Sequence, residues 1–313
     1  MNKVLVAGSY IYDVAVYVKD APIAGQTVLG EECKMSSGGK GSNQAVAAAK
    51  AGADVFMITK VGNDAFGRTV FDLYDQYHMS TKYVFQTDRA STGCASIVVD
   101  SHGQNRIVVV LGANNLLSAK DIQKAKEDIA DCDVLLTQFE SSNESICEFI
   151  RLGREYNKTV ILNPAPINDS ISKDIYKNVD YITPNETEAA QLANMSSITS
   201  LDDAKEAAKR ILELGVKNVI ITLGSLGSYF YNGNEEYHVL PLSVDVVDTT
   251  GAGDAYNGGF AWAKSNYMDD LEAMRYATCV AGLSVTRRGA ALSMPDAKDV
   301  QDLYNKVFKK EKD

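Results

Sequence analysis

The chain has 313 residues, of which 45% are hydrophobic and 23% are charged, a balance typical of a globular protein with a large core. Its 31 basic residues face 41 acidic ones, and the net charge of −10 argues against nucleic acid as the main partner. No apolar run is long enough to cross a membrane and no signal peptide is visible, so we expect a cytoplasmic protein with no membrane partner.

Two early stretches, residues 14–39 and 91–115, carry β-branched residues with partial alternation and turn signals. In the second, Ser101 to Asn105 has the composition of a hairpin loop. No low-complexity linker flanks either stretch. We therefore expect them to form a small sheet that is inserted into the main domain over one of its edges.

From about residue 130, short apolar runs alternate with longer helical stretches. The runs are CDVLLTQF, KTVILNPAP, VDYITPN and KNVIITLG, and the helical stretches include ESICEFIRLGREYN and LDDAKEAAKRILELG. Such alternation predicts a buried, mostly parallel sheet covered by helices on both faces. Further helices are expected over residues 251–264, 270–285 and 295–308. The predicted fold class is α/β, with residues 1–313 forming one domain.

The five cysteines, at positions 33, 94, 132, 147 and 279, form no Cys-x-x-Cys pair. An odd number at such spacing is typical of reduced, mostly buried thiols. The three histidines, His78, His102 and His238, lie in no evident motif. The sequence therefore disfavours a zinc site and Cys–His catalysis.

Two well-known phosphate-binding motifs do not fit the chain. KMSSGGKG resembles a Walker A motif, but Lys34 stands at the required first glycine and Gly41 at the metal-binding Ser or Thr. GAGDAY matches only half of a dinucleotide fingerprint, because Tyr256 replaces the last small residue. A P-loop NTPase and a classical NAD enzyme are both disfavoured.

Two glycine-rich turns remain, GGKGSN at residues 38–43 and GAGD at residues 251–254, and each precedes a helix of small residues. A helix N-terminus presents free N–H groups and a positive dipole end, which suits an anion. Between the turns, Asn185, Glu186 and Glu188 begin a helix after a predicted strand. Each feature also has a purely structural interpretation: a plain loop, a helix cap or, for Asp254, an acid in a first helical turn.

Several motifs occur together in a fixed order. GGKGSNQAVAAAKAGA and DTTGAGDAYNGGFA are joined by GSYIYD, QFES, NPAP, TPNETE, TLGSLG and VTRRGA. With these motifs the sequence resembles the ribokinase (PfkB) family of carbohydrate kinases over essentially its whole length, and within it the ribokinases and deoxyribokinases. The resemblance implies a mostly parallel central sheet flanked by helices. It also implies a small β-sheet lid that closes over a sugar and commonly joins two copies of the chain as a homodimer.

The resemblance further implies phosphate transfer from ATP to a sugar hydroxyl, with Asp254 as the catalytic base. The amides of Gly251, Ala252 and Gly253 would hold the charge that develops on the transferred group. The positions implied for nucleotide binding are Asn185, Thr222, Gly224, Ser225, Gly227 and Gly253.

Two cations are implied as well. Asn185 and Glu188 match the positions that organise Mg²⁺, often through water. A monovalent cation, potassium, is implied in a loop region whose ligands are mostly backbone carbonyls. The matching residues there are Asp248, Thr250, Ser284, Arg287, Gly289 and Ser293.

The sugar-contacting positions of the family correspond to Ile11, Asp13, Gly39, Lys40, Asn43 and Glu140, beside Asp254. Ile11 departs from the ribokinase pattern, in which Gly-Ser-Ile-Asn-Ala-Asp stands where this chain has GSYIYD. An apolar side chain there would leave a sugar hydroxyl unpaired, at a cost of about 1–3 kcal/mol. Deoxyribokinase-like members also carry an apolar residue at this position. We therefore expect a pocket that tolerates or prefers a sugar without the 2-hydroxyl, or one with an apolar group there; the alternative is that Ile11 only packs under the lid.

The predicted function is phosphorylation of the primary 5-hydroxyl of a pentose such as ribose or 2-deoxyribose. A nucleoside kinase is an alternative, because a base could lie near the aromatic rings of Tyr10 and Tyr12. A kinase for fructose or a fructose phosphate is another, although residues 88–115 offer only Arg89 and Arg106 for a phosphorylated substrate. A non-catalytic sugar-binding regulator would need a damaged catalytic set, whereas Asp254 and its glycine turn are intact.

Overall fold

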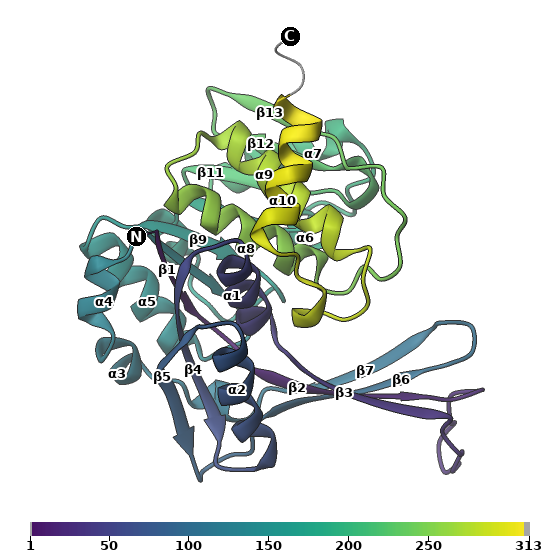
Figure 1. Ribbon diagram of the computed structural model, residues 1–313. Coiled ribbons are helices and arrows are strands. Elements are labelled where there is room, and N and C mark those ends of the chain that lie inside the picture. The colour runs from purple at the N-terminus through teal and green to yellow at the C-terminus, as the bar shows by residue number, and fades with distance from the viewer. Residues whose placement is uncertain (1, 310–313) are drawn as a thin grey trace.

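The computed structural model describes residues 2–309. Their strands form two β-sheets, one large and one small (Figure 1). The strands of the large sheet are β1 (Lys3–Ala7), β4 (Asp54–Gly62), β5 (Ser80–Thr87), β8 (Val134–Gln138), β9 (Thr159–Asn163), β10 (Tyr181–Ile182), β11 (Asn218–Thr222), β12 (Ser228–Tyr231) and β13 (Glu236–Val239). Their order is β13-β12-β11-β10-β9-β8-β1-β4-β5. The pairs β11–β12 and β12–β13 are antiparallel and the others are parallel, which confirms the predicted, mostly parallel sheet.

Helices cover both faces of the large sheet, as expected for strands that are apolar on both sides. They are α1 (Lys40–Lys50), α2 (Ala65–Gln76), α3 (Ala119–Gln123), α4 (Lys126–Asp131), α5 (Asn143–Glu155), α6 (Glu186–Leu192), α7 (Leu201–Leu212), α8 (Ala252–Ser265), α9 (Asp270–Ser284) and α10 (Ala297–Tyr304). Within residues 2–309, no helix combines the length and the apolar character needed to span a membrane.

Alternate residues of each strand enter two separate cores. In β1, Val4 and Val6 pack into the core shared with α1, α8, α9 and α10, whereas Leu5 and Ala7 pack into the core shared with α5 and α7. The period of two along a strand explains this division. Continuous apolar runs in the sequence therefore correspond to strands buried on both faces.

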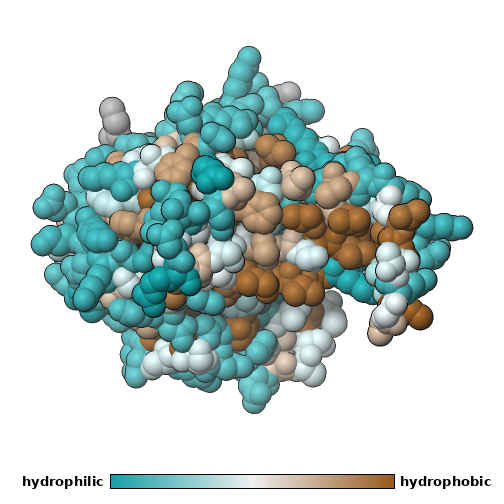
Figure 2. Space-filling view, turned by 90° about the horizontal axis from the view of Figure 1, so that it is seen from below, coloured by the Kyte–Doolittle hydropathy of each residue, from teal (hydrophilic) through white to brown (hydrophobic). Residues whose placement is uncertain are grey.

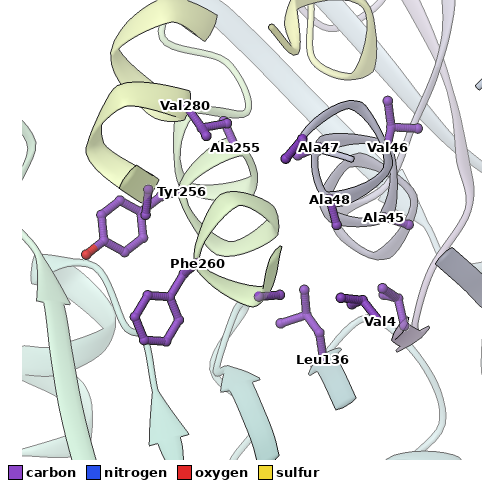
Figure 3. Close-up of a cluster of buried hydrophobic side chains, with 14 of the residues drawn as sticks. Val4, Ala45, Val46, Ala47, Ala48, Leu136, Ala255, Tyr256, Phe260 and Val280 are labelled. Atoms are coloured by element: carbon purple, nitrogen blue, oxygen red, sulfur yellow. The ribbon is translucent and has the colours of Figure 1, made fainter. Parts of the chain in front are cut away.

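Helices α1 and α8 approach each other closely on one face of the sheet, and Figure 3 shows Ala47 and Ala48 of α1 near Ala255 of α8. The approach depends on Gly258. A Cβ added there would lie 2.5 Å from the carbonyl oxygen of Gln44 and closer still to the Cβ of Ala47. Only a residue without a side chain fits this contact.

The second sheet is small and extends away from the body of the molecule, as Figure 1 shows. Its strands β2 (Ile11–Tyr17), β3 (Glu32–Gly38), β6 (Gly93–Val99) and β7 (Asn105–Val110) lie in the order β3-β2-β6-β7. The predicted hairpin loop is confirmed, because β6 and β7 pair around residues 100–104. β7 is exposed along its whole length, and Figure 2 shows apolar side chains gathered toward this side of the molecule.

Several boundaries differ from those expected from the sequence. β2 begins at Ile11, before residue 14, and residues 18–31 contain no strand. Residues 112–116 form a 3₁₀ helix, in which Asn114 hydrogen-bonds both the N–H and the carbonyl oxygen of Tyr10. These two hydrogen bonds hold the start of the small sheet, just before Ile11, against the body. The C-terminal helix is α-helical only to Tyr304 and continues as a π-helical turn.

The expectation of mostly buried thiols is wrong. Cys132 and Cys279 are buried, Cys94 is half-buried, and Cys33 and Cys147 are exposed. Cys33 lies in β3 of the small sheet, where both faces meet solvent, so composition alone gave no sign of its exposure.

The contact between α1 and α8 predicts a large difference between two glycines of one helix. Gly258→Ala should lower the free energy of unfolding by about 1–3 kcal/mol, because the added methyl group overpacks the interface. Gly253→Ala in the same helix is the control, since its added Cβ meets no atom within 4 Å. Urea unfolding of the two variants measures the difference, and equal stabilities would contradict the assigned contact.

Candidate active site

The candidate site lies at the edge of the large sheet where the parallel strands end. After β1 the chain adds β4 and β5 on one side of it, and then β8 to β13 on the other side. The direction in which successive strands are added therefore reverses beside β1. Ligands of open α/β sheets bind outside the carboxyl ends of the strands near such a point. Polar residues stand at or just after these ends: Ser9, Gln138, Asn163, Thr183 and Thr222.

A cavity of about 660 Å³ opens at this edge. It brings together residues that are far apart in the sequence but were predicted to share a site. Those that line it are Lys40, Asn185, Glu188, Thr222, Gly224, Ser225, Gly227, Gly251, Ala252, Gly253 and Asp254.

The turn before α8 is built to leave room in front of the helix. Gly251 has a left-handed backbone conformation, φ 76°, and caps the helix without a side chain. The N–H of Ala252 donates to the carbonyl oxygen of Thr249 at 3.2 Å, so it is engaged within the turn. The N–H groups of Gly251 and Gly253 have no partner within residues 2–309. An anion in front of α8 could therefore accept from Gly251 and Gly253, while Ala252 is less available than predicted.

Asp254 lies in the first turn of α8 and is only 7% exposed. Two side chains of α1 hold its carboxylate: Asn43 Nδ2 donates to Oδ2 at 2.9 Å, and Gln44 Nε2 donates to Oδ1 at 3.0 Å. The Oδ1 atom of Asn43 is buried and has no partner among the described residues. A buried acceptor of this kind is costly unless a ligand donates to it.

One cationic side chain, Lys40, lies among three acidic ones, Asp254, Glu140 and Glu188. Burial works to lower the pKa of the Lys40 ammonium, but the nearby charges of Asp254, Glu140 and Glu188 outweigh it and raise that pKa. Lys40 is therefore charged at neutral pH. Glu140 accepts hydrogen bonds from Ser9 Oγ at 2.6 Å and from the backbone N–H of Lys40 at 2.9 Å, and burial raises the pKa of its carboxyl.

Ile11 and Asp13 lie on one face of β2, because side chains two residues apart share a face. Ile11 is 3% exposed yet belongs to neither hydrophobic core of the body. Burial, followed by the charge of Glu140, raises the pKa of the Asp13 carboxyl to about 6. A Cβ at Gly38 would clash with the Asp13 carboxylate, and one at Gly39, φ 90°, would lie 2.8 Å from the backbone nitrogen of Ile11.

Tyr10 and Tyr12 do not face this region. Tyr10 is fully buried, and its hydroxyl lies 2.7 Å from both Ser37 Oγ and Thr69 Oγ1. Tyr12 lies on the face of β2 opposite to Ile11 and Asp13 and stacks on Phe66, with ring centroids 4.5 Å apart. The aromatic rings that suggested a site for a nucleoside base are thus used to join the small sheet to α2.

Asn185 and Glu188 form a reciprocal cap at the start of α6. Asn185 Oδ1 accepts from the N–H of Glu188, and Glu188 Oε2 accepts from the N–H of Asn185, both at 2.9 Å. The helix-cap interpretation is therefore correct. The cap leaves Asn185 Nδ2 and Glu188 Oε1 for a ligand, and both residues also line the cavity.

The other end of the cavity combines a short polar turn with an apolar wall. Thr222 ends β11, and Gly224 and Ser225 lie in the 3₁₀ turn that follows it. Gly227 has φ 89°, and a Cβ there would clash with the carbonyl oxygen of Val239. The apolar residues of this end are Pro241, Leu242, Val244, Val246, Ala281 and Val285.

Three of the residues predicted for a monovalent cation, Asp248, Thr250 and Gly289, are joined by hydrogen bonds. Asp248 accepts from the N–H groups of Thr250 at 2.9 Å and Gly289 at 3.0 Å. Burial opposes ionisation of Asp248, but these bonds outweigh it and lower its pKa. Three other predicted side chains are engaged elsewhere: Ser284 and Ser293 bond carbonyls of their own turns, and Arg287 pairs with Asp299.

Sequence reasoning missed a buried polar network behind Asp254. Its members are Gln44, Gln138, Asn163, Thr183 and Asn257. A signal was present, because VLLTQ, TVILN and YIT each place a polar residue at the end of an apolar strand. Parallel strands bring such residues to one edge.

Comparisons with known proteins agree with this arrangement. A model of the pfkB family of carbohydrate kinases matches residues 1–297. The chain is 35% identical to a deoxyribokinase of Salmonella typhi over 299 residues, which cover 96% of this chain and 97% of the relative. It is 36% identical to a ribokinase of Mus musculus over 301 residues, which cover 95% and 93%.

Solved structures give the same result. The ribokinase of Thermotoga maritima aligns with a TM-score of 0.88 at 35% identity, covering 97% of this chain and 99% of the other. The ribokinase of Arabidopsis thaliana complexed with ribose and ATP aligns with a TM-score of 0.89 at 30% identity, covering 96% and 98%.

The environment of Asp13 predicts a carboxyl that titrates near pH 6. A ¹³C NMR titration of side-chain carboxyls measures this, and Asp13→Asn identifies the signal by its loss. Glu140→Gln should lower the midpoint, because a negative charge is removed, yet keep it above the ordinary value of about 3.9, because burial persists. A midpoint near pH 4 in the unsubstituted protein would contradict the assigned burial.

Proposed function

The chain belongs to the PfkB family of carbohydrate kinases, which transfer phosphate from ATP to a sugar hydroxyl, and we propose that its substrate is a pentose phosphorylated on the 5-hydroxyl. The observation that carries this proposal is the buried Asp254 carboxylate, which lines the cavity and is held by α1 beside free N–H groups of the α8 turn. The ribose and ATP of the Arabidopsis thaliana structure support the same substrate class.

In the proposed step, Asp254 accepts the proton of the sugar's 5-hydroxyl while the oxygen of that hydroxyl attacks the γ-phosphorus of ATP. The new oxygen–phosphorus bond forms while the bond from the γ-phosphorus to the β–γ bridging oxygen breaks. The bridging oxygen keeps the electron pair, and ADP leaves. Such transfer depends on positioning and charge stabilisation. The N–H groups of Gly251 and Gly253 and the Lys40 ammonium are placed to supply that stabilisation.

Mg²⁺ fits the residues at the start of α6. No three His, Cys, Asp or Glu side chains within residues 2–309 are grouped as a metal cage, which suits an ion that keeps several waters and binds the phosphates of its nucleotide. Glu188 Oε1 would hold such an ion through water, and Asn185 Nδ2 would donate to a phosphate. When bound, Mg²⁺ supplies positive charge that screens the phosphates.

Potassium activation is part of the proposal. Asp248 is ionised and fixed by Thr250 and Gly289, and Gly251 of the α8 turn packs on the same loop at Ala290. A cation bound there would steady the turn that holds the phosphate. Rates measured in potassium and in sodium buffers test this, and equal rates would contradict it.

A homodimer formed through the small sheet is also proposed. Met35, Ile107, Val108, Val109 and Val110 of its strands are each about half exposed or more, which is unusual for a sheet in a protein that works as a monomer. A second copy of the small sheet would cover them. Sedimentation equilibrium measures the mass, and a monomer at micromolar concentration would contradict the proposal.

We propose that the small sheet is the lid of the sugar site and that Asp13, Asn43 and Glu140 bind the sugar hydroxyls. The unpartnered Oδ1 of Asn43 supports this, because it needs a donor. Ile11, on the same face as Asp13, offers none. The proposed pocket therefore tolerates or prefers 2-deoxyribose.

A cytoplasmic location, where ATP is available, belongs to the same proposal, and the five free cysteines support it.

The alternatives differ in the substrate that would release ADP. A nucleoside kinase would need space for a base, and Tyr10 and Tyr12 are used in packing. A kinase of fructose or its phosphates and a non-catalytic regulator remain to be tested in the same assay. ADP release over a panel of pentoses, fructose, fructose phosphates and nucleosides distinguishes all of these.

Removal of the proposed base should slow the reaction strongly. Asp254→Asn is expected to lower kcat by about 10²- to 10⁴-fold, because the amide cannot accept the hydroxyl proton. Asp245→Asn is the control, since it removes the same charge from an exposed residue outside the cavity. Steady-state ADP release measures both, and a near-normal kcat for Asp254→Asn would rule out the assigned base.

The choice of sugar should depend on Ile11. We expect kcat/KM for 2-deoxyribose to equal or exceed that for ribose. Ile11→Asn should shift the ratio toward ribose by about 5- to 150-fold, the equivalent of 1–3 kcal/mol for pairing one buried hydroxyl. Tyr12→Asn, on the opposite face of β2, should leave the ratio unchanged. A strong preference for ribose in the unsubstituted protein would contradict the role of Ile11.

A further inference from the structure

Three amide side chains are buried beside Asp254. Gln44 of α1 and Gln138 at the end of β8 are 0% exposed, and Asn163 at the end of β9 is 6% exposed and also lines the cavity. They carry no charge, and the proposed transfer step does not use them. Buried amides are costly unless they are hydrogen-bonded, so the partners of these three side chains decide their orientation.

The hydrogen bonds of these amides run in one direction. Asn163 Nδ2 donates to the backbone oxygen of Thr183 at 2.9 Å, so its Oδ1 must face Gln44. Gln44 Nε2 donates to that Oδ1 at 3.0 Å and to Asp254 Oδ1 at 3.0 Å. A backbone carbonyl can only accept, and it therefore sets the orientation of the whole chain of amides.

Gln138 follows that orientation. Its Nε2 donates to Gln44 Oε1 at 2.7 Å, while its own Oε1 is buried without a partner among the described residues. If the Gln44 amide were reversed, its oxygen would face the oxygens of Asn163 and Asp254, whichever way the Gln138 amide points. Both of these contacts would then be repulsive. The structure thus allows Gln44 to present only its NH₂ group to Asp254.

The two oxygens of Asp254 differ as a result. Oδ1 is bound by a fully buried donor with no alternative orientation. Oδ2 is bound by Asn43, which carries a buried, unpartnered oxygen and is itself proposed to bind the sugar. The charged groups around the carboxylate are Lys40, Glu140 and Glu188.

We propose that Gln44 is a positioning residue that holds Oδ1 of Asp254 and so assigns Oδ2 as the oxygen that takes the proton from the sugar hydroxyl. Asn163 acts through Gln44 by fixing its amide, and Gln138 donates to the oxygen of that amide. This inference rests on the proposed role of Asp254 as base. In a buried site, small displacements of a reacting group slow the reaction by up to about 10²-fold, so loss of the hold on Oδ1 should act on the transfer step.

Gln44→Met tests the inference, because methionine has a similar length and no donor. We expect kcat to fall about 10- to 100-fold, while KM for the sugar and for ATP changes less than about threefold. In the Asp254→Asn background the same substitution should change kcat by less than about twofold, since its effect passes through the Asp254 carboxylate. Gln76→Met, at the exposed end of α2, is the control and should leave kcat unchanged.

A purely structural role for Gln44 would give a different result. The losses from Gln44→Met and Asp254→Asn would then multiply, and a multiplicative loss overturns the inference. A near-normal kcat for Gln44→Met beside a slow Asp254→Asn overturns it as well and leaves the proposed function intact. A near-normal kcat for Asp254→Asn instead overturns the proposed function.

Gln138→Met keeps the test decisive if Gln44→Met does not fold. It leaves Gln44 in place and removes only the donor to its Oε1 atom. We expect a smaller fall in kcat than for Gln44→Met and, again, no further fall in the Asp254→Asn background. An independent effect in that background would overturn the inference.

Discussion

The close contact between α1 and α8 at Gly258 is the constraint on which the site depends. Asn43 and Gln44 belong to α1, and Asp254 lies one helical turn before Gly258 in α8. Because the backbone of Gln44 touches the helix at Gly258, the donors of α1 reach the Asp254 carboxylate at 2.9 and 3.0 Å. The packing of two helices against one face of the sheet thus sets hydrogen-bond distances at its edge.

Much of the fold followed from the sequence because its signals are local. Apolar runs between helical stretches indicated the parallel sheet, and Ser101 to Asn105 indicated the hairpin. The residues predicted for the nucleotide and its phosphates come together in the cavity, since glycine turns and strand ends carry their own patterns. Ile11, Asp13, Gly39, Asn43 and Glu140, predicted to contact the sugar, are not among its lining residues. The start of β2 at Ile11 was missed, although Gly8 and Ser9 are turn-favouring residues between β1 and β2.

Features that depend on tertiary packing could not be predicted in this way. Nothing near Gln44 in the sequence shows that Asn163 will orient its amide, because Asn163 reaches it only through the strand order. The same holds for Tyr12, whose partner Phe66 lies in α2. The cap formed by Asn185 and Glu188 was weighed as one of two interpretations, and the structure shows that a helix cap and a cavity wall can be the same residues.

Asn114 holds the start of the small sheet against the body of the molecule. Asn114 fixes Tyr10 at the point where the chain leaves the body, and Ile11 and Asp13 lie just beyond it on the small sheet. Asp254, in contrast, belongs to the body. Any movement of the small sheet about Asn114 would carry Ile11 and Asp13, which are proposed to contact the sugar, and would leave Asp254, the proposed base, in place. Substitutions on the small sheet could therefore change the proposed sugar contacts without changing the residues around Asp254.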